Sequence, residues 1–137
     1  MKLLIDTNVV LDVLLARNPF CGPAEQVLGL SQREDVEEYV SASTITDIYY
    51  IAHRQLKDRD LTKNLIRRLI SVVSVAAVSE KEIETALNLS WSDFEDSVQY
   101  SVALLSDFDA IVTRDAIGYY DAEIRVVSPE QILDELA

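Results

Sequence analysis

Short apolar runs alternate along this chain with segments in which apolar residues recur every three or four positions. The apolar runs predict strands at 2–5, 37–42, 71–75, 110–113 and 123–127. The periodic segments predict helices at about 9–16, 19–32, 43–56, 61–70, 79–89 and 92–105, with a last helix beginning at Ser128-Pro129. Strands that alternate with helices indicate right-handed crossovers. The pattern therefore predicts a three-layer α/β/α fold with a mostly parallel central sheet.

Polar residues mark where several of these helices should begin. Ser43 or Thr44 is expected to cap the helix after the second strand, and Thr44 with Asp47 resembles a capping box. Ser92, with Glu95 three residues later, predicts the start of the helix that ends near position 105. These boundaries place Asp47 and Asp96 in the first turns of their helices.

Composition narrows the classes of protein to consider. The 137 residues fit one domain, 1–137, and nearly half of them are hydrophobic. The single Cys21 cannot form an internal disulfide, no segment resembles a signal peptide, and no apolar run is long enough to cross a bilayer. We therefore expect a cytoplasmic protein without a membrane segment. Three glycines, in neither phosphate-loop pattern, argue against dinucleotide and P-loop chemistry.

Charge is unevenly distributed along the chain. The net charge of −12 argues against a polyanionic partner, but half of the basic residues lie between positions 54 and 68. This basic segment either binds nucleic acid or is a solvated helix face, and the sequence favours neither. The candidates for RNA contact are Arg54, Lys57, Lys63, Arg67 and Arg68, together with Arg114 near the last acidic residue.

Four aspartates are expected at the same edge of the sheet. Asp6 and Asp115 follow predicted strands, whereas Asp47 and Asp96 begin helices. In an open parallel sheet, ligands bind beyond the carboxyl ends of the strands. Asp107 and Asp109 precede a strand, so we expect them at the opposite edge with no part in chemistry.

Each aspartate alone could serve only to stabilise a helix start. Four together repel one another unless a cation lies between them. Oxygen ligands without nearby histidine or cysteine favour Mg²⁺ or Mn²⁺, and the one histidine, His53, is expected to be structural. Attack by a metal-activated water is then the best-supported hydrolytic mechanism, because no Ser-His or Cys-His pair is present.

Further polar residues adjoin this acidic set. Thr7 and Asn8 could orient Asp6 or a metal-bound water, and Thr113 could donate a hydrogen bond to a carboxylate. Asp93 is either a further ligand or a surface charge, while Arg114 either holds a phosphate or pairs with an acid. Asp12 is expected to be exposed to solvent.

Four segments resemble the motifs of PIN domains, in order and over nearly the whole chain. They are LIDTNVVLD (4–12), STITDIYY (43–50), DFED (93–96) and IVTRD (111–115). The resemblance implies a metal-dependent ribonuclease, and for a small stand-alone domain it implies a VapC-type toxin. Such toxins are commonly homodimers, and an antitoxin wraps them and obstructs the acidic site.

The resemblance has one departure. The second acidic position is commonly glutamate in the family, whereas Asp47 is shorter by a methylene, so its metal contact could run through water. The resemblance otherwise assigns Asp6, Asp47, Asp96 and Asp115 as the catalytic, metal-binding set.

Two alternatives remain. A PIN-like domain could bind RNA or a protein without cutting, although such a module has no evident need for four converging carboxylates. A receiver-type phosphoryl-transfer domain would need a lysine at a later strand end, and no lysine is placed there.

Overall fold

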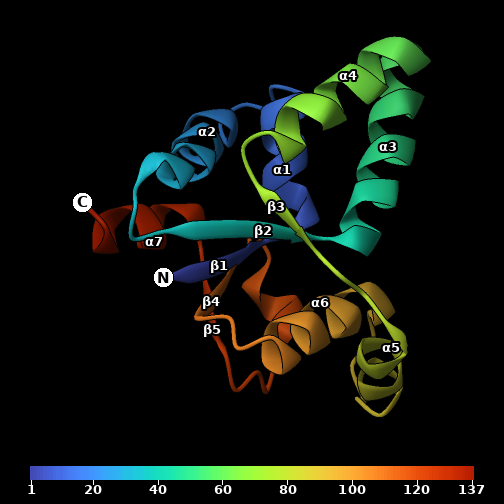
Figure 1. Ribbon diagram of the computed structural model, residues 1–137, viewed down its shortest axis with the longest axis vertical. Helices are drawn as coiled ribbons and strands as arrows, with labels where there is room; N and C mark the ends of the chain where they lie inside the picture. Colours follow the sequence, from blue (N-terminus) through green and yellow to red (C-terminus); the bar gives the residue numbers. More distant parts are fainter.

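The computed structural model describes residues 1–137 as one five-stranded sheet with helices on both faces (Figure 1). The strands are β1 (Lys2–Ile5), β2 (Glu37–Ser41), β3 (Ser74–Ala76), β4 (Ala110–Val112) and β5 (Arg125–Val127). The α-helices are α1 (Thr7–Leu14), α2 (Cys21–Gly29), α3 (Ala42–Leu56), α4 (Arg59–Ile70), α5 (Glu80–Leu87), α6 (Phe94–Leu105) and α7 (Pro129–Glu135). Two 3₁₀ turns, η1 (Leu30–Gln32) and η2 (Ala116–Tyr119), complete the order.

All strand pairs are parallel, and the strands lie in the order β3-β2-β1-β4-β5. The chain therefore builds outward from β1 on one side and then continues with β4 on the other side. The order reverses between β1 and β4, and in open α/β sheets the crevice at such a point is where ligands bind. Residues that follow these two strands are thus the first candidates for a site.

Two apolar cores lie on opposite faces of the sheet. Leu3 and Ile5 of β1 point into the larger core, which α1, α2, α3 and α7 cover, whereas Leu4 points into the smaller core beneath α6. Alternation of side chains along a strand explains why neighbouring residues enter different cores. Figure 1 shows the same division, with α5 and α6 on one side of the sheet and α1, α2 and α7 on the other. The predicted three-layer arrangement is confirmed.

Several predicted boundaries were wrong by a few residues. Ser41 caps α3, because its hydroxyl accepts a hydrogen bond from the Thr44 amide at 3.2 Å, so the helix begins before Ser43. Asp93, not Ser92, caps α6 by accepting from the Asp96 amide at 3.1 Å. The observed cap lies two residues before the predicted one in α3 and one residue after it in α6.

Two strands are shorter than their apolar runs predicted. Residues 71–73 donate to carbonyls of α4 and so form the last turns of that helix before β3 begins. The amide of Glu123 donates to the Tyr100 hydroxyl at 3.1 Å, which leaves it outside the β5 ladder.

None of the seven helices combines the length and the apolar character that a membrane span requires.

Candidate active site at the carboxyl edge of the sheet

Asp6 lies at the end of β1 and also begins α1. Its Oδ1 accepts from the Thr7 amide at 2.7 Å, and its Oδ2 accepts from the Thr113 hydroxyl at 2.8 Å. Its own amide donates to the carbonyl of Val112 at 2.9 Å, which ties the ends of β1 and β4 together. Asp6 is therefore held at the point where the strand order reverses.

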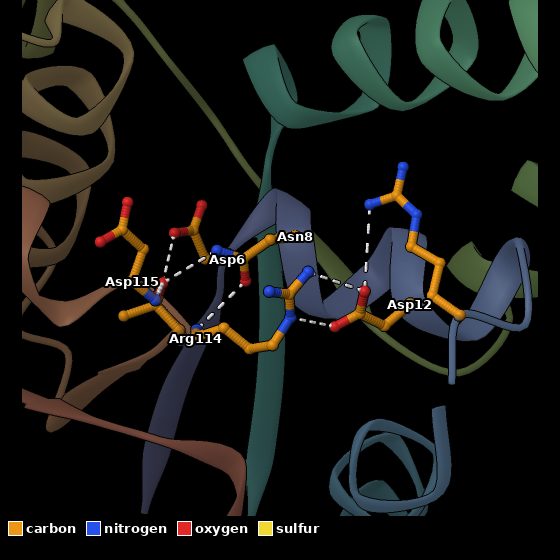
Figure 2. A network of polar contacts seen from close by, with 7 residues as sticks. Asp6, Asn8, Asp12, Arg114 and Asp115 are labelled. Atoms are coloured by element: carbon orange, nitrogen blue, oxygen red, sulfur yellow. Dashed lines mark hydrogen bonds and ion pairs between the residues drawn. The ribbon is translucent and has the colours of Figure 1, made fainter. Parts of the chain in front are cut away.

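Asp96 and Asp115 reach the same place from other elements. Asp96 lies in the first turn of α6, and Asp115 follows β4 immediately before η2. Gly118 of η2 packs so closely that an added Cβ would overlap Oδ2 of Asp96, and this Cβ would lie 3.9 Å from Oδ2 of Asp115. The missing side chain of Gly118 thus makes room for the carboxyl group of Asp96. Figure 2 shows Asp115 next to Asp6, with both carboxyl groups directed to the same side.

These residues line an open pocket of about 270 Å³. Five of its ten lining residues are carboxylates, namely Asp6, Asp93, Glu95, Asp96 and Asp115. Thr7 and Asn8 also line it, as the sequence predicted for residues that accompany Asp6. A larger cavity of about 650 Å³ lies between α1, α2 and α4, but its lining is mainly apolar and has no carboxylate cluster. The smaller, acidic pocket is the candidate for chemistry.

Asp47 lies outside the pocket lining, and Glu95 takes a place there that the sequence had not assigned. Glu95 Oε1 accepts from the Thr7 hydroxyl at 3.4 Å. Burial raises the pKa of Glu95 to about 7, with further contributions from a hydrogen bond and repulsion involving Asp47. Asp47 therefore adjoins the cluster through Glu95. A contact of Asp47 with a metal, direct or through water, stays a prediction.

Burial and mutual repulsion both raise the pKa values of carboxylates in this pocket. Burial raises the pKa of Asp96 to about 7, and the charges of Asp6, Asp93 and Asp115 raise it further. Burial also raises the pKa of Asp6, while hydrogen bonds from Thr113 and Thr7 oppose the shift. A site that concentrates negative charge at this density favours a cation.

A buried polar network lies beneath Asp6. The Gln99 amide donates to Asp6 Oδ1 at 3.1 Å and to the Thr44 hydroxyl at 2.9 Å, and Gln99 is fully buried. Thr44 also receives hydrogen bonds from Thr7 at 3.1 Å and Ser41 at 3.0 Å. Because a carboxylate only accepts hydrogen bonds, the Gln99 nitrogen must face Asp6, and its oxygen is left without a partner.

Besides Glu95, sequence reasoning missed three residues of this site, and two of these three leave a signal. Gln99 lies one turn after Asp96 on α6, so helical spacing places both on one face. Gly118 is the only glycine after the last acidic motif. Tyr119 gave no such signal. Its hydroxyl is buried without a hydrogen bond of normal geometry, and burial with the charges of Asp6 and Asp96 raises its pKa.

Asp12 is fully buried, which corrects the prediction that it is exposed. Arg114 donates to both of its oxygens, at 2.5 Å from Nε to Oδ2 and at 3.0 Å from Nη2 to Oδ1 (Figure 2). Asn8 bridges this pair to the acidic set, because it receives a hydrogen bond from the Arg114 amide at 3.2 Å and donates to Thr113 at 3.2 Å. A buried charge needs such pairing, and the partner lies too far away in sequence for local pattern to reveal it.

The predicted basic residues and the predicted opposite edge have clear positions. Five candidate RNA contacts are exposed on or beside α3 and α4, namely Arg54, Lys57, Lys63, Arg67 and Arg68. None of them lines the acidic pocket. Their contact with RNA stays a prediction. Asp109 accepts from the Lys2 amide at 2.6 Å at the start of β1, so it lies at the opposite edge as expected. His53 stacks on Tyr49 with ring centroids 5.5 Å apart.

The donor set fits a hard divalent cation. Its ligands would be carboxylate oxygens, with threonine and asparagine side chains beside them, which is the chemistry that Mg²⁺ and Mn²⁺ prefer. No group of three acidic, histidine or cysteine side chains already surrounds one point as metal ligands. A bound cation would offset the negative charge of these carboxylates, because burial first and the neighbouring carboxylates second raise the pKa values of Asp96 and Glu95.

Solved structures from several bacteria resemble this chain. VapBC-1 from nontypeable Haemophilus influenzae has a TM-score of 0.72 at 14% identity, with 95% of this chain and 99% of that chain covered. FitAcB from Neisseria gonorrhoeae has a TM-score of 0.67 at 19% identity, with coverage of 93% and 98%. Mycobacterium tuberculosis VapC20, described as a sarcin-ricin loop cleaving toxin, has a TM-score of 0.67 at 18% identity, with coverage of 90% and 98%.

Sequence comparison identifies the family directly. No curated protein sequence matches the chain. The family model described as PIN domain matches residues 2–116, which span all four acidic motifs. The chain therefore belongs to the PIN domain family.

Proposed function

We propose that this protein is a metal-dependent ribonuclease that hydrolyses RNA phosphodiester bonds. The observation that carries the proposal is the convergence of Asp6, Asp96 and Asp115 in one open pocket at the reversal point of the sheet. Membership of the PIN family, whose members include nucleases, supports the same reaction. A pocket this rich in carboxylates has no evident use in a module that only binds RNA.

Asp6, Asp96 and Asp115 would hold Mg²⁺ or Mn²⁺, with Glu95 as the fourth carboxylate at the pocket and Asp47 behind it. Such an ion lowers the pKa of water and stabilises the leaving oxygen when it is bound. Thr113 and Gln99 fix the two oxygens of Asp6 from opposite sides, so that the carboxyl group keeps one orientation. Asn8 holds the Thr113–Arg114 segment against α1 and thereby sets the distance between Asp6 and Asp115.

We further propose that the enzyme is the toxin of a toxin–antitoxin pair and forms a homodimer. The support is that structural relatives are described as VapBC and toxin–antitoxin complexes, among them one from Klebsiella pneumoniae. An antitoxin would inactivate the enzyme by covering the acidic pocket. Light scattering on the purified protein tests the dimer, and a mass of one chain would contradict it.

The test of hydrolysis compares wild type with Asp6→Asn and Asp96→Asn on a panel of structured and unstructured RNAs. We expect cleavage with Mg²⁺ or Mn²⁺ and none with chelator, and each substitution should lower the rate at least about 100-fold. Asp107→Asn is the matched control. Asp107 is an exposed acid at a positive φ of 55°, where asparagine fits equally well. Cleavage that persists in chelator or in both variants would contradict the mechanism. RNA binding by wild type without cleavage would favour the binding module.

The toxin role is tested in cells. Expression of the wild type should arrest growth, and expression of Asp96→Asn should not. Co-expression of a short reading frame that adjoins the gene should relieve the arrest and yield a complex with the toxin. Arrest by the Asp96→Asn variant would show that toxicity does not depend on the acidic pocket.

A further inference from the structure

One buried carboxylate holds two arginines beside the acidic pocket. Asp12 of α1 is fully buried, and both of its oxygens accept from Arg114. Arg17, just beyond the same helix, places Nη1 3.9 Å from Asp12 Oδ1. Two guanidinium groups and one carboxylate leave this cluster with a surplus positive charge. We refer to Arg17 and Arg114 as the arginine pair and to Asp12 as its anchor.

Both arginines keep donors that the protein does not use. Asp12 occupies Nε and Nη2 of Arg114, whereas a guanidinium has five N–H groups. The side chain of Arg114 is 29% exposed and that of Arg17 is 35% exposed, so the remaining donors meet solvent. Arg114 also stacks on Phe20, with its central carbon 3.9 Å from the ring centroid, which fixes the plane of the group. An arginine with a fixed plane and free donors is well suited to a phosphate.

The position of the pair matters as much as its charge. Arg17 is the only basic residue among the ten that line the acidic pocket. Arg114 directly precedes Asp115 in the chain, and its side chain turns from the carboxyl groups of Asp6 and Asp115 toward Asp12, farther along α1 (Figure 2). A phosphodiester that approaches five carboxylates is repelled, and a positive charge at the pocket wall offsets part of that repulsion.

We propose that Arg17 and Arg114, fixed by Asp12, bind a phosphate of the RNA backbone that flanks the phosphodiester being hydrolysed. Asp6 and Arg17 lie beyond opposite ends of α1, whose eight residues span about 12 Å, so we place the arginine-bound phosphate next to the phosphate at Asp6 rather than at the same one. This inference rests on the proposed ribonuclease function. It assigns substrate positioning to residues at the pocket rather than to the basic segment of α3 and α4, none of which lines the pocket.

The experiment measures binding of a fluorescein-labelled, mixed-sequence single-stranded oligoribonucleotide at several salt concentrations. The protein carries Asp96→Asn so that the RNA stays intact. Arg17→Gln and Arg114→Gln should each weaken binding about tenfold, and each should lower the slope of log affinity against log salt by about 0.7. Lys81→Gln on α5 makes the same charge change away from the pocket and should leave affinity and slope unchanged. Circular dichroism and melting temperature confirm that each variant is folded.

Asp12→Asn separates anchoring from general electrostatics. This substitution makes the protein less negative, so a purely electrostatic effect would tighten RNA binding. If Asp12 holds the arginines in place, its loss should instead weaken binding, because the guanidinium groups are no longer fixed. Tighter binding would overturn the anchoring role, and unchanged affinity in Arg17→Gln would overturn the phosphate site.

The outcomes also distinguish this inference from the proposed function. If the wild type cleaves no RNA but Arg17→Gln weakens binding, the phosphate site stands and hydrolysis does not. If the wild type cleaves RNA and neither arginine variant changes affinity, hydrolysis stands and the phosphate site is overturned.

Discussion

Crowding around single side chains defines the acidic pocket. Asp96 keeps its place beside η2 because Gly118 has no Cβ, which would overlap the Asp96 carboxyl group. Asp6 keeps its orientation because Thr113 and Gln99 donate to its two oxygens. Small changes at Gly118 and Gln99 should therefore alter metal binding far more than they alter folding.

Gly118→Ala should displace the carboxyl group of Asp96 and lower Mn²⁺ affinity at least about tenfold. The clash is with the end of a rotatable side chain, so the free energy of unfolding should change by less than about 1 kcal/mol. Calorimetric titration with Mn²⁺ and urea unfolding measure the two effects. Gly22→Ala is the control, because nothing lies within 4 Å of its added Cβ. Equal Mn²⁺ affinity in wild type and Gly118→Ala would show that the glycine does not shape the site.

Gln99→Met keeps the volume of the side chain and removes the hydrogen bond to Asp6. Residues that orient metal ligands typically contribute 10- to 100-fold to affinity, so we expect a loss of about this size for Mn²⁺. Titration calorimetry is again the measurement, and Gln55→Met on the exposed face of α3 is the control. A variant that loses stability but binds Mn²⁺ normally would make Gln99 a purely structural residue.

The positions of single residues could be predicted where the chain itself carried the signal, whereas the role of these residues as metal ligands stays a prediction. Asp6, Asp96 and Asp115 each follow a strand or begin a helix, and the structure brings these three together. The prediction that Asp12 is exposed was wrong because its partner Arg114 lies 102 positions away, and only the folded chain reveals that contact. Glu95 was overlooked because it fitted the role of a helix-capping residue.

Among the secondary structure elements, β2 contains an unusual charge. Glu38 is buried on the face of β2 that points to the larger core, and neither carboxylate oxygen has a hydrogen-bond partner of normal geometry. Burial raises the pKa of Glu38 to about 8, and the Ser31 amide offsets only part of the shift. Ionised Glu38 is therefore unfavourable in the folded state.

Glu38→Gln should stabilise the protein at pH 8 but not at pH 5. The pKa of Glu38 is higher in the folded chain than in the unfolded chain, so stability is lost as the pH rises from about 4.5 to 8. The neutral variant escapes this loss, which we expect to be about 2 to 4 kcal/mol. Urea unfolding between pH 5 and 8 measures the difference. Glu37→Gln, exposed on the same strand, is the control, and parallel pH curves for wild type and Glu38→Gln would contradict the prediction.

Element types followed from the sequence, whereas several ends did not. Periodicity placed every helix and strand in the right order, because burial of one face governs that pattern. The caps Ser41 and Asp93 were missed because competing serine and threonine residues lie within two positions. The pattern of apolar residues alone also could not predict that residues 71–73 form a turn bonded to the end of α4 before β3 begins.

Over the whole molecule, negative charge is concentrated at the site and opposes the folded state. The pKa of Asp96, about 7 in the folded protein, lies above the value of 3.8 for the free side chain. Ionised Asp96 thus costs free energy, fully so above pH 7 and not at all below about pH 4. Because the group is half exposed, the cost is about 1 to 2 kcal/mol.

Asp96→Asn should therefore raise the melting temperature at pH 8 when no metal is present. Mg²⁺ should raise the melting temperature of wild type by about 3 to 8 °C, since the ion binds only the folded chain. The variant should lose most of this response. The measurement is a set of thermal scans without Mg²⁺ and at Mg²⁺ concentrations that rise in 10-fold steps. Asp107→Asn is the control. A Mg²⁺ response that is equal in wild type and Asp96→Asn would place the ion elsewhere.

The outward order in which the sheet is built also has a consequence during synthesis. Asp6 is synthesised before Thr113, which fixes it and follows 107 positions later. At ordinary elongation rates this interval takes roughly 5 to 20 s. The strand order, with β4 placed beside β1 after β2 and β3 have been made, delays assembly of the acidic pocket until β4 has been synthesised. Under the proposed function, the chain would gain its activity only after this interval, and an antitoxin already present would meet the enzyme at that point.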